Sequence, residues 1–192
     1  LKLFVDALRQ RVGHLITLSN IAKDLQISPN TAKNWVSLLE SMYVGFAVYP
    51  LQKNVARAIQ KPFKFFFYDN ADAIDDKGGR FENLIATTLL KRLHFIEDYH
   101  GYRCQLHYVR DKDGREVDFV TVIDDTIIDL IEVKYSDSDI STSLKYYALN
   151  LQAKRSVQIV HHLKRPYDAN GILVTSATDF FSAPPWQQIE EK

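Results

Sequence analysis

The spacing of apolar residues changes near residue 50, and this change limits the folds open to the chain. Before that point apolar residues recur at intervals of three and four, as at Leu1, Phe4 and Leu8, which is the period of an amphipathic helix. Beyond it, short apolar runs typical of strands alternate with further helical segments. We therefore predict a small helical segment over residues 1–60 and a mixed α/β domain over residues 61–192.

The first segment contains the pattern of a helix-turn-helix. Ser19 is a good helix N-cap, and Ser28 is a second one, followed by Pro29 at a first helical position where its missing N–H costs nothing. Two short capped helices joined by a tight turn are typical of this motif. The apolar run 44–49 is expected to form a wing strand, so the segment is predicted to be winged-helix-like.

Positive charge is concentrated in this first part. Residues 1–64 hold nine Lys/Arg and three Asp/Glu, a net charge of 9 − 3 = +6, although the whole chain is neutral. The expected recognition helix carries a polar face at helical spacing, made of Asn30, Lys33, Asn34 and Ser37. Such side chains can meet base edges and phosphates in a major groove. A solvated face or a protein contact is the alternative, and the pattern alone does not choose between them.

The second part is expected to be an α/β domain. The turn Asp113–Gly114 between two alternating runs is a strong hairpin signal. From residue 80 the expected order of elements is α-β-β-β-α-β, with one further strand behind. After a buried aromatic strand at 63–68 and a polar loop at 69–79, we expect helices at 81–93 and 144–151 and strands at 106–110, 116–123, 127–134, 157–160 and 172–174.

Acidic residues in two of these strands are spaced so that they share a face. Side chains two apart point the same way, which pairs Glu116 with Asp118 and Glu132 with Lys134. The two strands are consecutive and are expected to pair, so Asp118 should lie beside Glu132. Clustered carboxylates repel each other unless a cation lies between them, and oxygen ligands suit Mg²⁺ or Mn²⁺. Glu82, in the first turn of a helix, is expected to close the site from the side.

A metal held in this way has a clear chemical use. It lowers the pKa of bound water and neutralises charge on a scissile phosphate, while Lys134 is expected to orient or deprotonate that water. The alternative is a half-buried sheet face with an ordinary cross-strand ion pair, which is the commoner origin of an isolated Glu-x-Lys. The order helix acid, strand Asp, strand Glu-x-Lys favours the metal site.

Several short motifs in this order resemble a known family. They are Gly79–Asn83, Tyr108–Arg110, Gly114–Phe119 and Ile131–Lys134, and the run 61–69 resembles the strand that opens the same domain. The chain is similar to the C-terminal part of uncharacterised prokaryotic AAA-type ATPases. Those proteins begin with a P-loop ATPase, continue through a winged helix and end in a domain similar to PD-(D/E)xK nucleases such as the archaeal Holliday-junction resolvases.

The resemblance implies a restriction-endonuclease-like fold and Mg²⁺- or Mn²⁺-dependent hydrolysis of DNA. It implies that the catalytic residues are Glu82, Asp118, Glu132 and Lys134, and that Asp118 and Glu132 bind the metal. It also implies a missing ATPase module of the same chain as partner, and a homo-oligomer as a candidate assembly. No G-x-x-x-x-G-K-[ST] is present, so ATP hydrolysis is not expected here. A non-catalytic nucleic-acid-binding, oligomerisation or regulatory module of the ATPase is the alternative.

The remaining signals concern the compartment. A single cysteine, Cys104, excludes an internal disulfide framework, and no apolar run reaches the roughly 18 residues that span a bilayer. We therefore expect a cytoplasmic protein. The chain begins with Leu1 inside a helical pattern, so we expect a C-terminal fragment of a longer protein. His161 and His162 follow a strand without further zinc ligands at suitable spacing, and are expected to be strand-end residues.

Overall fold

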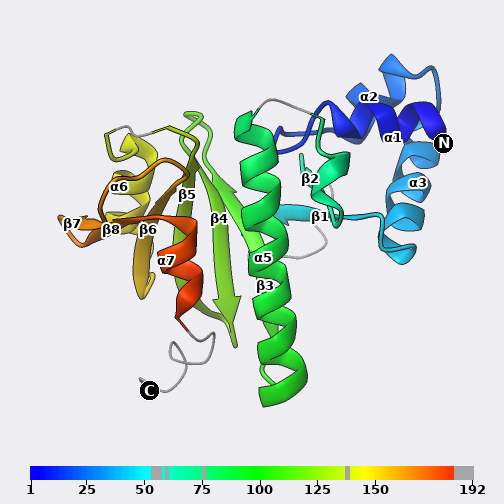
Figure 1. Ribbon diagram of the computed structural model, residues 1–192. Helices are drawn as coiled ribbons and strands as arrows, with labels where there is room; N and C mark the ends of the chain where they lie inside the picture. The colour runs from blue at the N-terminus through cyan, green and yellow to red at the C-terminus, as the bar shows by residue number, and fades with distance from the viewer. Residues whose placement is uncertain (53–57, 59–60, 75–76, 137–138, 184–192) are drawn as a thin grey trace. The chain divides into compact units, whose positions relative to one another are not determined.

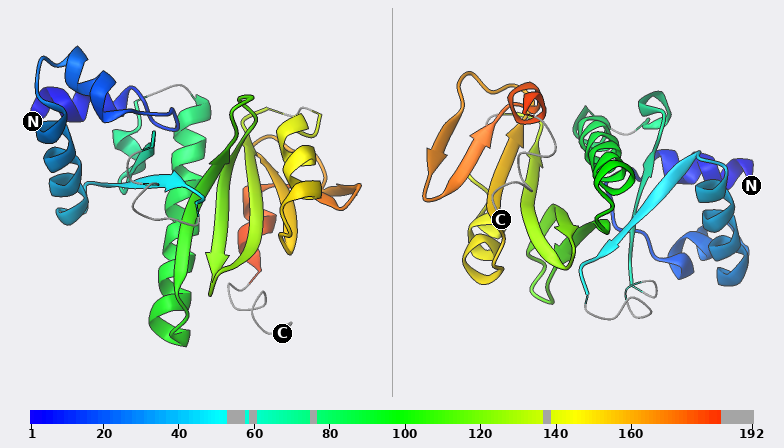
Figure 2. Two further views of the ribbon diagram at one scale, coloured as in Figure 1. Left: turned by 180° about the vertical axis from the view of Figure 1, so that it is seen from behind. Right: turned by 90° about the horizontal axis from the view of Figure 1, so that it is seen from below.

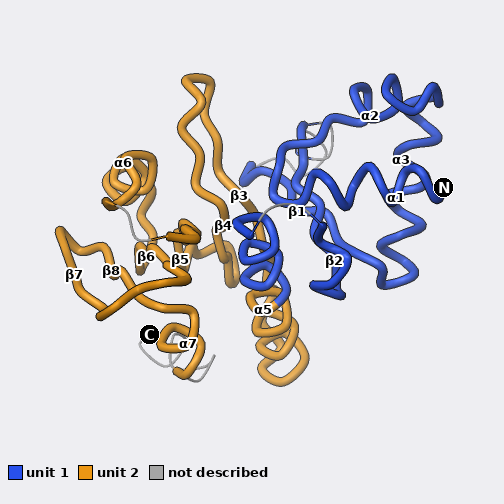
Figure 3. The backbone as a smooth tube through the Cα atoms, turned by 45° about the horizontal axis from the view of Figure 1, so that its top comes forward, with its two compact units in different colours: residues 1–87 blue, residues 88–192 orange. Residues whose placement is uncertain are grey.

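A computed structural model describes residues 1–52, 58, 61–74, 77–136 and 139–183. The chain divides into two compact units, Leu1–Thr87 and Thr88–Lys192, which Figure 3 shows in separate colours. Figure 1 labels the helices and strands along the chain. Both units combine helices with strands, and the second contains a mixed sheet, so the α/β class predicted from the sequence is confirmed.

Unit 1 begins with three helices, as the apolar spacing predicted. The second of them is capped by Thr17, whose side chain accepts the Asn20 N–H, and not by Ser19, so that prediction was wrong. Thr17 has the extended backbone that a cap needs, whereas Ser19 already lies in the first helical turn. Ser28 does cap the third helix, with Pro29 at its start. The three are α1 (Lys2–Arg9), α2 (Leu18–Asp24) and α3 (Pro29–Ser41).

The core of unit 1 lies where these helices face each other. Trp35 of α3 meets Phe4 of α1 edge-on, with ring centroids 5.5 Å apart. Apolar side chains at helical spacing are buried on all three helices, which is what an amphipathic pattern requires. They are Phe4, Leu8, Ile21, Ala22, Ala32, Val36 and Leu39.

The expected wing strand forms and pairs with the aromatic strand. β1 (Gly45–Pro50) runs antiparallel to β2 (Lys64–Phe67), with Gly45 opposite Phe67. All four residues of β2 are buried. The sequence assigned this strand to the second part, but its backbone pairs inside unit 1, and the structural division follows Thr87. The expected boundary at residue 60 itself falls outside the described residues.

One long helix, α5 (Lys77–His100), follows a single 3-10 turn at Asn70–Asp72. It extends beyond the predicted 81–93 at both ends. The first turn is helical although it contains Gly78 and Gly79, which favour turns, and no Pro or Gly interrupts residues 94–100. Among the residues that the structure describes, no helix is both long and apolar enough to cross a membrane.

Unit 2 contains a six-stranded mixed sheet in the order β3-β4-β5-β6-β8-β7. The first three strands are antiparallel, whereas β5–β6 and β6–β8 are parallel. The predicted succession α-β-β-β-α-β is confirmed, while β7 and α7 were not predicted. The elements after α5 are β3 (Cys104–Arg110), β4 (Glu116–Ile123), β5 (Thr126–Lys134), α6 (Thr142–Asn150), β6 (Arg155–Val160), β7 (Tyr167–Ala169), β8 (Ile172–Thr175) and α7 (Ala177–Ser182).

Helices cover both faces of this sheet. In the right-hand view of Figure 2, α6 lies on one side and α7 on the other, with the strands between them. Helix α6 contacts β4, β5 and β6. On the opposite side the carboxyl-terminal half of α5 packs Leu93 and Ile96 against Ile123 and Ile128. A sheet covered in this way is buried at its centre, so any polar side chain there needs a partner.

Candidate metal and active site

The pairing of β4 with β5 places the predicted acids side by side. Phe119 is opposite Ile131, and both are fully buried. One step further along the same register, Asp118 comes opposite Glu132. Directly opposed residues of an antiparallel pair share a face, so this register places Asp118 and Glu132 on one face, while their role as site residues stays a prediction.

Glu132 is the most constrained residue of this face. Its side chain is only 7% exposed. One carboxylate oxygen, Oε1, lies 2.7 Å from the Lys134 ammonium. The other, Oε2, is buried and has no hydrogen-bond partner among the described residues. A buried oxygen without a donor is costly, and it marks a place where a cation or water would be stabilised.

Burial also changes the acidity of Glu132. Loss of solvation, helped by the nearby negative charge of Asp118, raises the pKa of Glu132 to about 7. Lys134 and the Ser141 hydroxyl act in the opposite direction. The carboxyl is therefore partly protonated at neutral pH, and a bound cation would favour the charged form.

Asp118 is held in place by the neighbouring strand. Its Oδ2 accepts the backbone N–H of Val133 at 2.9 Å. Val133 lies between Glu132 and Lys134, so the carboxylate is tied to the strand that carries the other two residues. This bond ties the Asp118 side chain to the backbone of β5.

Gln158 is a neighbour that the sequence analysis missed. It is fully buried on β6, opposite Glu132 in the parallel register. Its Oε1 accepts the backbone N–H of Ser141, the N-cap of α6, at 2.9 Å. Gln158 thus anchors the start of α6 beside Glu132. A glutamine inside the otherwise apolar run 157–160 was the available signal, but its strand partner was not known.

Glu82 belongs to unit 1, whereas the other three predicted residues belong to unit 2. Its Oε1 lies 3.1 Å from the Nζ of Lys64, a lysine that is 1% exposed. A Cβ added at Gly13 would lie 2.5 Å from Glu82 Oε2, so the backbone packs closely on this carboxylate. The next residue, Asn83, bonds both the N–H and the C=O of Phe67. Within unit 1, Glu82 therefore helps to dock α5 on β2.

The donor set fits Mg²⁺ better than a metal that needs a full protein cage. Among the described residues, no group of three or more His, Cys, Asp or Glu side chains could hold a metal ion. Mg²⁺ is commonly bound by one or two carboxylates and keeps several waters. Asp118 and Glu132 are two carboxylates that could serve in this way, and Oε2 of Glu132 makes no hydrogen bond among the described residues, so metal binding here stays a prediction.

Comparison with protein families decides the affiliation of the chain. A domain of unknown function, DUF8612, matches residues 1–72, and a second one, DUF4143, matches residues 77–180, more than half of the chain. The chain belongs to the DUF4143 family. This domain is commonly found with AAA ATPases, in agreement with that part of the resemblance. No curated protein and no solved structure matches the chain. Asp118, Glu132, Lys134 and Gln158 all lie within the DUF4143 match.

The DUF8612 match contains the predicted recognition helix. On α3 the side chains of Asn30, Lys33, Asn34 and Ser37 are all exposed, as expected for a polar face. Lys33 and Ser37 also line a cavity of about 310 Å³ together with Glu40. The face is accessible to a partner, and contact with DNA stays a prediction.

Proposed function

We propose that the DUF4143 domain of this chain is a Mg²⁺- or Mn²⁺-dependent phosphodiesterase that cleaves DNA. Asp118 and Glu132 hold the metal, and Lys134 acts beside it. The buried Oε2 of Glu132 carries this proposal, because among the described residues that oxygen makes no hydrogen bond, although the Ser141 hydroxyl and a second carboxylate, Asp118, lie near the Glu132 carboxylate. A buried oxygen without a partner calls for a bound ion or water, and the adjacent carboxylate of Asp118 favours an ion.

The proposed chemistry divides between the metal and the chain. The bound ion would activate a water molecule and neutralise charge on the phosphate. Lys134, already 2.7 Å from Glu132, has three N–H donors and can turn to a phosphate oxygen or to the attacking water. Asp118 keeps its direction through the Val133 N–H. Gln158 holds the start of α6 and so limits movement around Glu132.

Two further features support the proposal. The order α-β-β-β-α-β, with an antiparallel hairpin followed by a parallel strand, agrees with the PD-(D/E)xK resemblance. The association of DUF4143 with AAA ATPases supports an ATPase module as a partner. DNA as substrate, a cytoplasmic location and a homo-oligomeric assembly are proposed from the resemblance alone. These partner, location and assembly proposals depend on the family resemblance and would fail if the resemblance were wrong.

A non-catalytic module is the second candidate, and one observation favours it. The Glu132–Lys134 pair already neutralises one charge, and the described residues lack a third acidic or histidine ligand. In that case the domain would bind nucleic acid or an ATPase partner without cleaving anything.

Cleavage and metal binding together separate the two candidates. With Mg²⁺ and branched or linear DNA, Asp118→Asn should lower cleavage at least about a hundredfold, because metal activation of water contributes several kcal/mol. Lys134→Ala should abolish cleavage while Mg²⁺ still raises the melting temperature. The control is Asp98→Asn on the exposed surface of α5, which should cleave like wild type. A wild-type melting temperature that ignores millimolar Mg²⁺ and Mn²⁺ would overturn the metal site.

A further inference from the structure

Three aromatic rings gather where β5 and β6 end. Tyr135 and His161 are the first residues beyond these strands, and their rings stack with centroids 4.8 Å apart and planes 20° apart. His162 meets both rings edge-on, at 5.3 Å from Tyr135 and 4.2 Å from His161. The His161 N–H donates to the Lys134 carbonyl at 3.0 Å, which continues the parallel pairing and sets the two stacked rings opposite each other.

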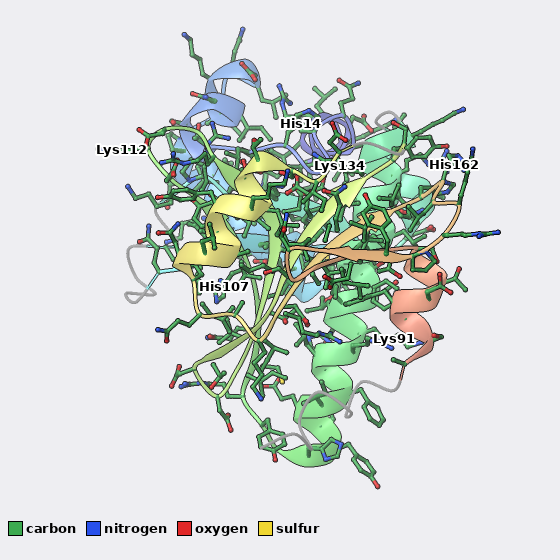
Figure 4. All side chains as sticks on the ribbon, turned by 90° about the vertical axis from the view of Figure 1, so that its left-hand side faces the viewer. His14, Lys91, His107, Lys112, Lys134 and His162 are labelled. Carbon is green, nitrogen blue, oxygen red and sulfur yellow. The ribbon has the colours of Figure 1, made fainter. Side chains whose placement is uncertain are left out.

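This ring cluster lies next to the candidate active site along the chain. Tyr135 directly follows Lys134 and is three residues beyond Glu132, a distance of about 10 Å along an extended strand at roughly 3.3 Å per residue. Figure 4 shows Lys134 and His162 near the same end of the sheet. A polymer bound at Glu132 and Lys134 would therefore reach the rings within a few of its repeating units.

The rings are suited to stacking and not only to local packing. The side chains of His161 and His162 are both exposed. Aromatic side chains whose only role is to fill a hydrophobic core are usually buried. Loss of solvation and the neighbouring His162 lower the pKa of His161, which favours the neutral ring. A neutral ring held by two neighbours loses little freedom when a further aromatic face is placed on it.

Nucleobases are the aromatic faces that a DNA-cleaving domain would meet. In a duplex each base is covered by its neighbours, so only an unpaired base can present its face to a protein ring. Stacking on aromatic side chains is a common means of binding single strands, and it tolerates any base. Among the described residues, no third His, Cys, Asp or Glu joins the two histidines in a possible metal site.

We propose that Tyr135, His161 and His162 form a stacking platform for an unpaired nucleobase beside the cleavage site. The preferred substrate would then contain a single-stranded or frayed segment, such as a flap or a branch, and not an uninterrupted duplex. The choice of a nucleobase as ligand and the assignment of a cleavage site rest on the proposed function, but base binding can be measured without cleavage.

Binding without cleavage tests the platform directly. Anisotropy of a labelled single-stranded oligonucleotide, measured on the full chain in EDTA, should show at least a fivefold weaker affinity for His161→Ala, since the loss of one stacked base commonly has this effect or more. His161→Phe should restore most of the affinity, because stacking needs a ring face and not the imidazole nitrogens. Duplex affinity should change much less.

A second stacked pair supplies the control. Phe95 and Tyr99 on α5 stack with centroids 5.4 Å apart and planes 9° apart, and Tyr99 is exposed, so Tyr99→Ala removes a comparable ring. This variant should bind the single strand like wild type. If His161→Ala fails to fold by circular dichroism, His162→Ala is read in its place.

The outcomes separate the platform from the nuclease proposal. Equal affinity of wild type and His161→Ala for the single strand overturns the platform, as does an equal loss for single strand and duplex. Absence of any single-strand binding by wild type overturns it too. A selective loss in His161→Ala without any Mg²⁺-dependent cleavage by wild type leaves the platform standing and removes the nuclease.

Discussion

At the scale of single residues, Glu132 shows how its surroundings set its charge. It lies in the apolar interior of a sheet, beside Asp118 and 2.7 Å from Lys134. Loss of solvation outweighs the attraction of the lysine, and the pKa rises from 4.5 to about 7. A metal would reverse this balance, so the same residue titrates differently in the metal-free and metal-bound protein.

The raised pKa of Glu132 makes metal-free stability depend on pH. Because the folded protein binds this proton more tightly than the unfolded chain, the stabilisation is complete below about pH 4.5 and is lost as pH rises through about 7. Glu132→Gln keeps the shape without the titration. In EDTA we expect the variant to be more stable than wild type at pH 8, by about 3 kcal/mol at most, with the difference shrinking towards pH 4.

Denaturant unfolding at several pH values checks this prediction. Glu97→Gln, an exposed substitution on α5, is the control and should follow the wild-type pH dependence. If Glu132→Gln were less stable than wild type at pH 8, the stabilisation from the ion pair with Lys134 would exceed the cost of burying the charged carboxylate. That result would support a purely structural role for Glu132 and Lys134.

At the scale of elements, the contact between α5 and the loop after α1 depends on a glycine. Gly13 has φ +75°, and a Cβ there would come within 2.5 Å of Glu82 Oε2. Glu82 in turn pairs with the buried Lys64 of β2, so displacing its carboxylate disturbs a buried charge. Gly13 therefore supports both a turn and the docking of α5.

We expect Gly13→Ala to destabilise the chain by about 1 kcal/mol or more, because the left-handed backbone and the close contact both disfavour a methyl group. Gly171→Ala is a matched control, since Gly171 has φ +73° but no atom within 4 Å of an added Cβ. The difference between the two unfolding free energies reports the contact with Glu82. Equal losses would show that only the backbone conformation matters.

Helix α3 carries the second prediction at this scale. Lys33 and Asn34 are exposed on its polar face, within the part of the chain that holds the net charge of +6 counted above. If this face binds DNA, replacing both by Ala should weaken binding, and wild-type affinity should fall steeply with salt as counterions are released. Lys91→Ala, exposed on α5, serves as the control. Affinity that responds to neither change would assign α3 to protein contacts.

At the scale of the whole molecule, two family matches and two structural units divide the chain differently. The DUF8612 match ends at residue 72 and the DUF4143 match begins at residue 77, whereas the two structural units divide after Thr87. The difference arises because α5 begins in unit 1, where Asn83 holds the backbone of Phe67. Helix α5 continues through the division after Thr87, so the chain is helical at the boundary between the two units.

The sequence by itself determined the succession of elements and the shared face of Asp118 and Glu132. Both depend on local periods, 3.6 for helices and two for strands, which are visible in a single chain. It misplaced the cap at Ser19, because the choice between nearby Ser and Thr depends on which backbone is extended, and Thr17 is.

Only the tertiary structure decided what these residues face. The parallel register of β5 and β6 brought Gln158 beside Glu132, and continued pairing set His161 against Tyr135. Burial raised the pKa of Glu132, and pairing with β1 placed β2 in unit 1. None of these follows from a local period, because the partners lie far apart in the chain and the register between them is set by the packing of the whole sheet.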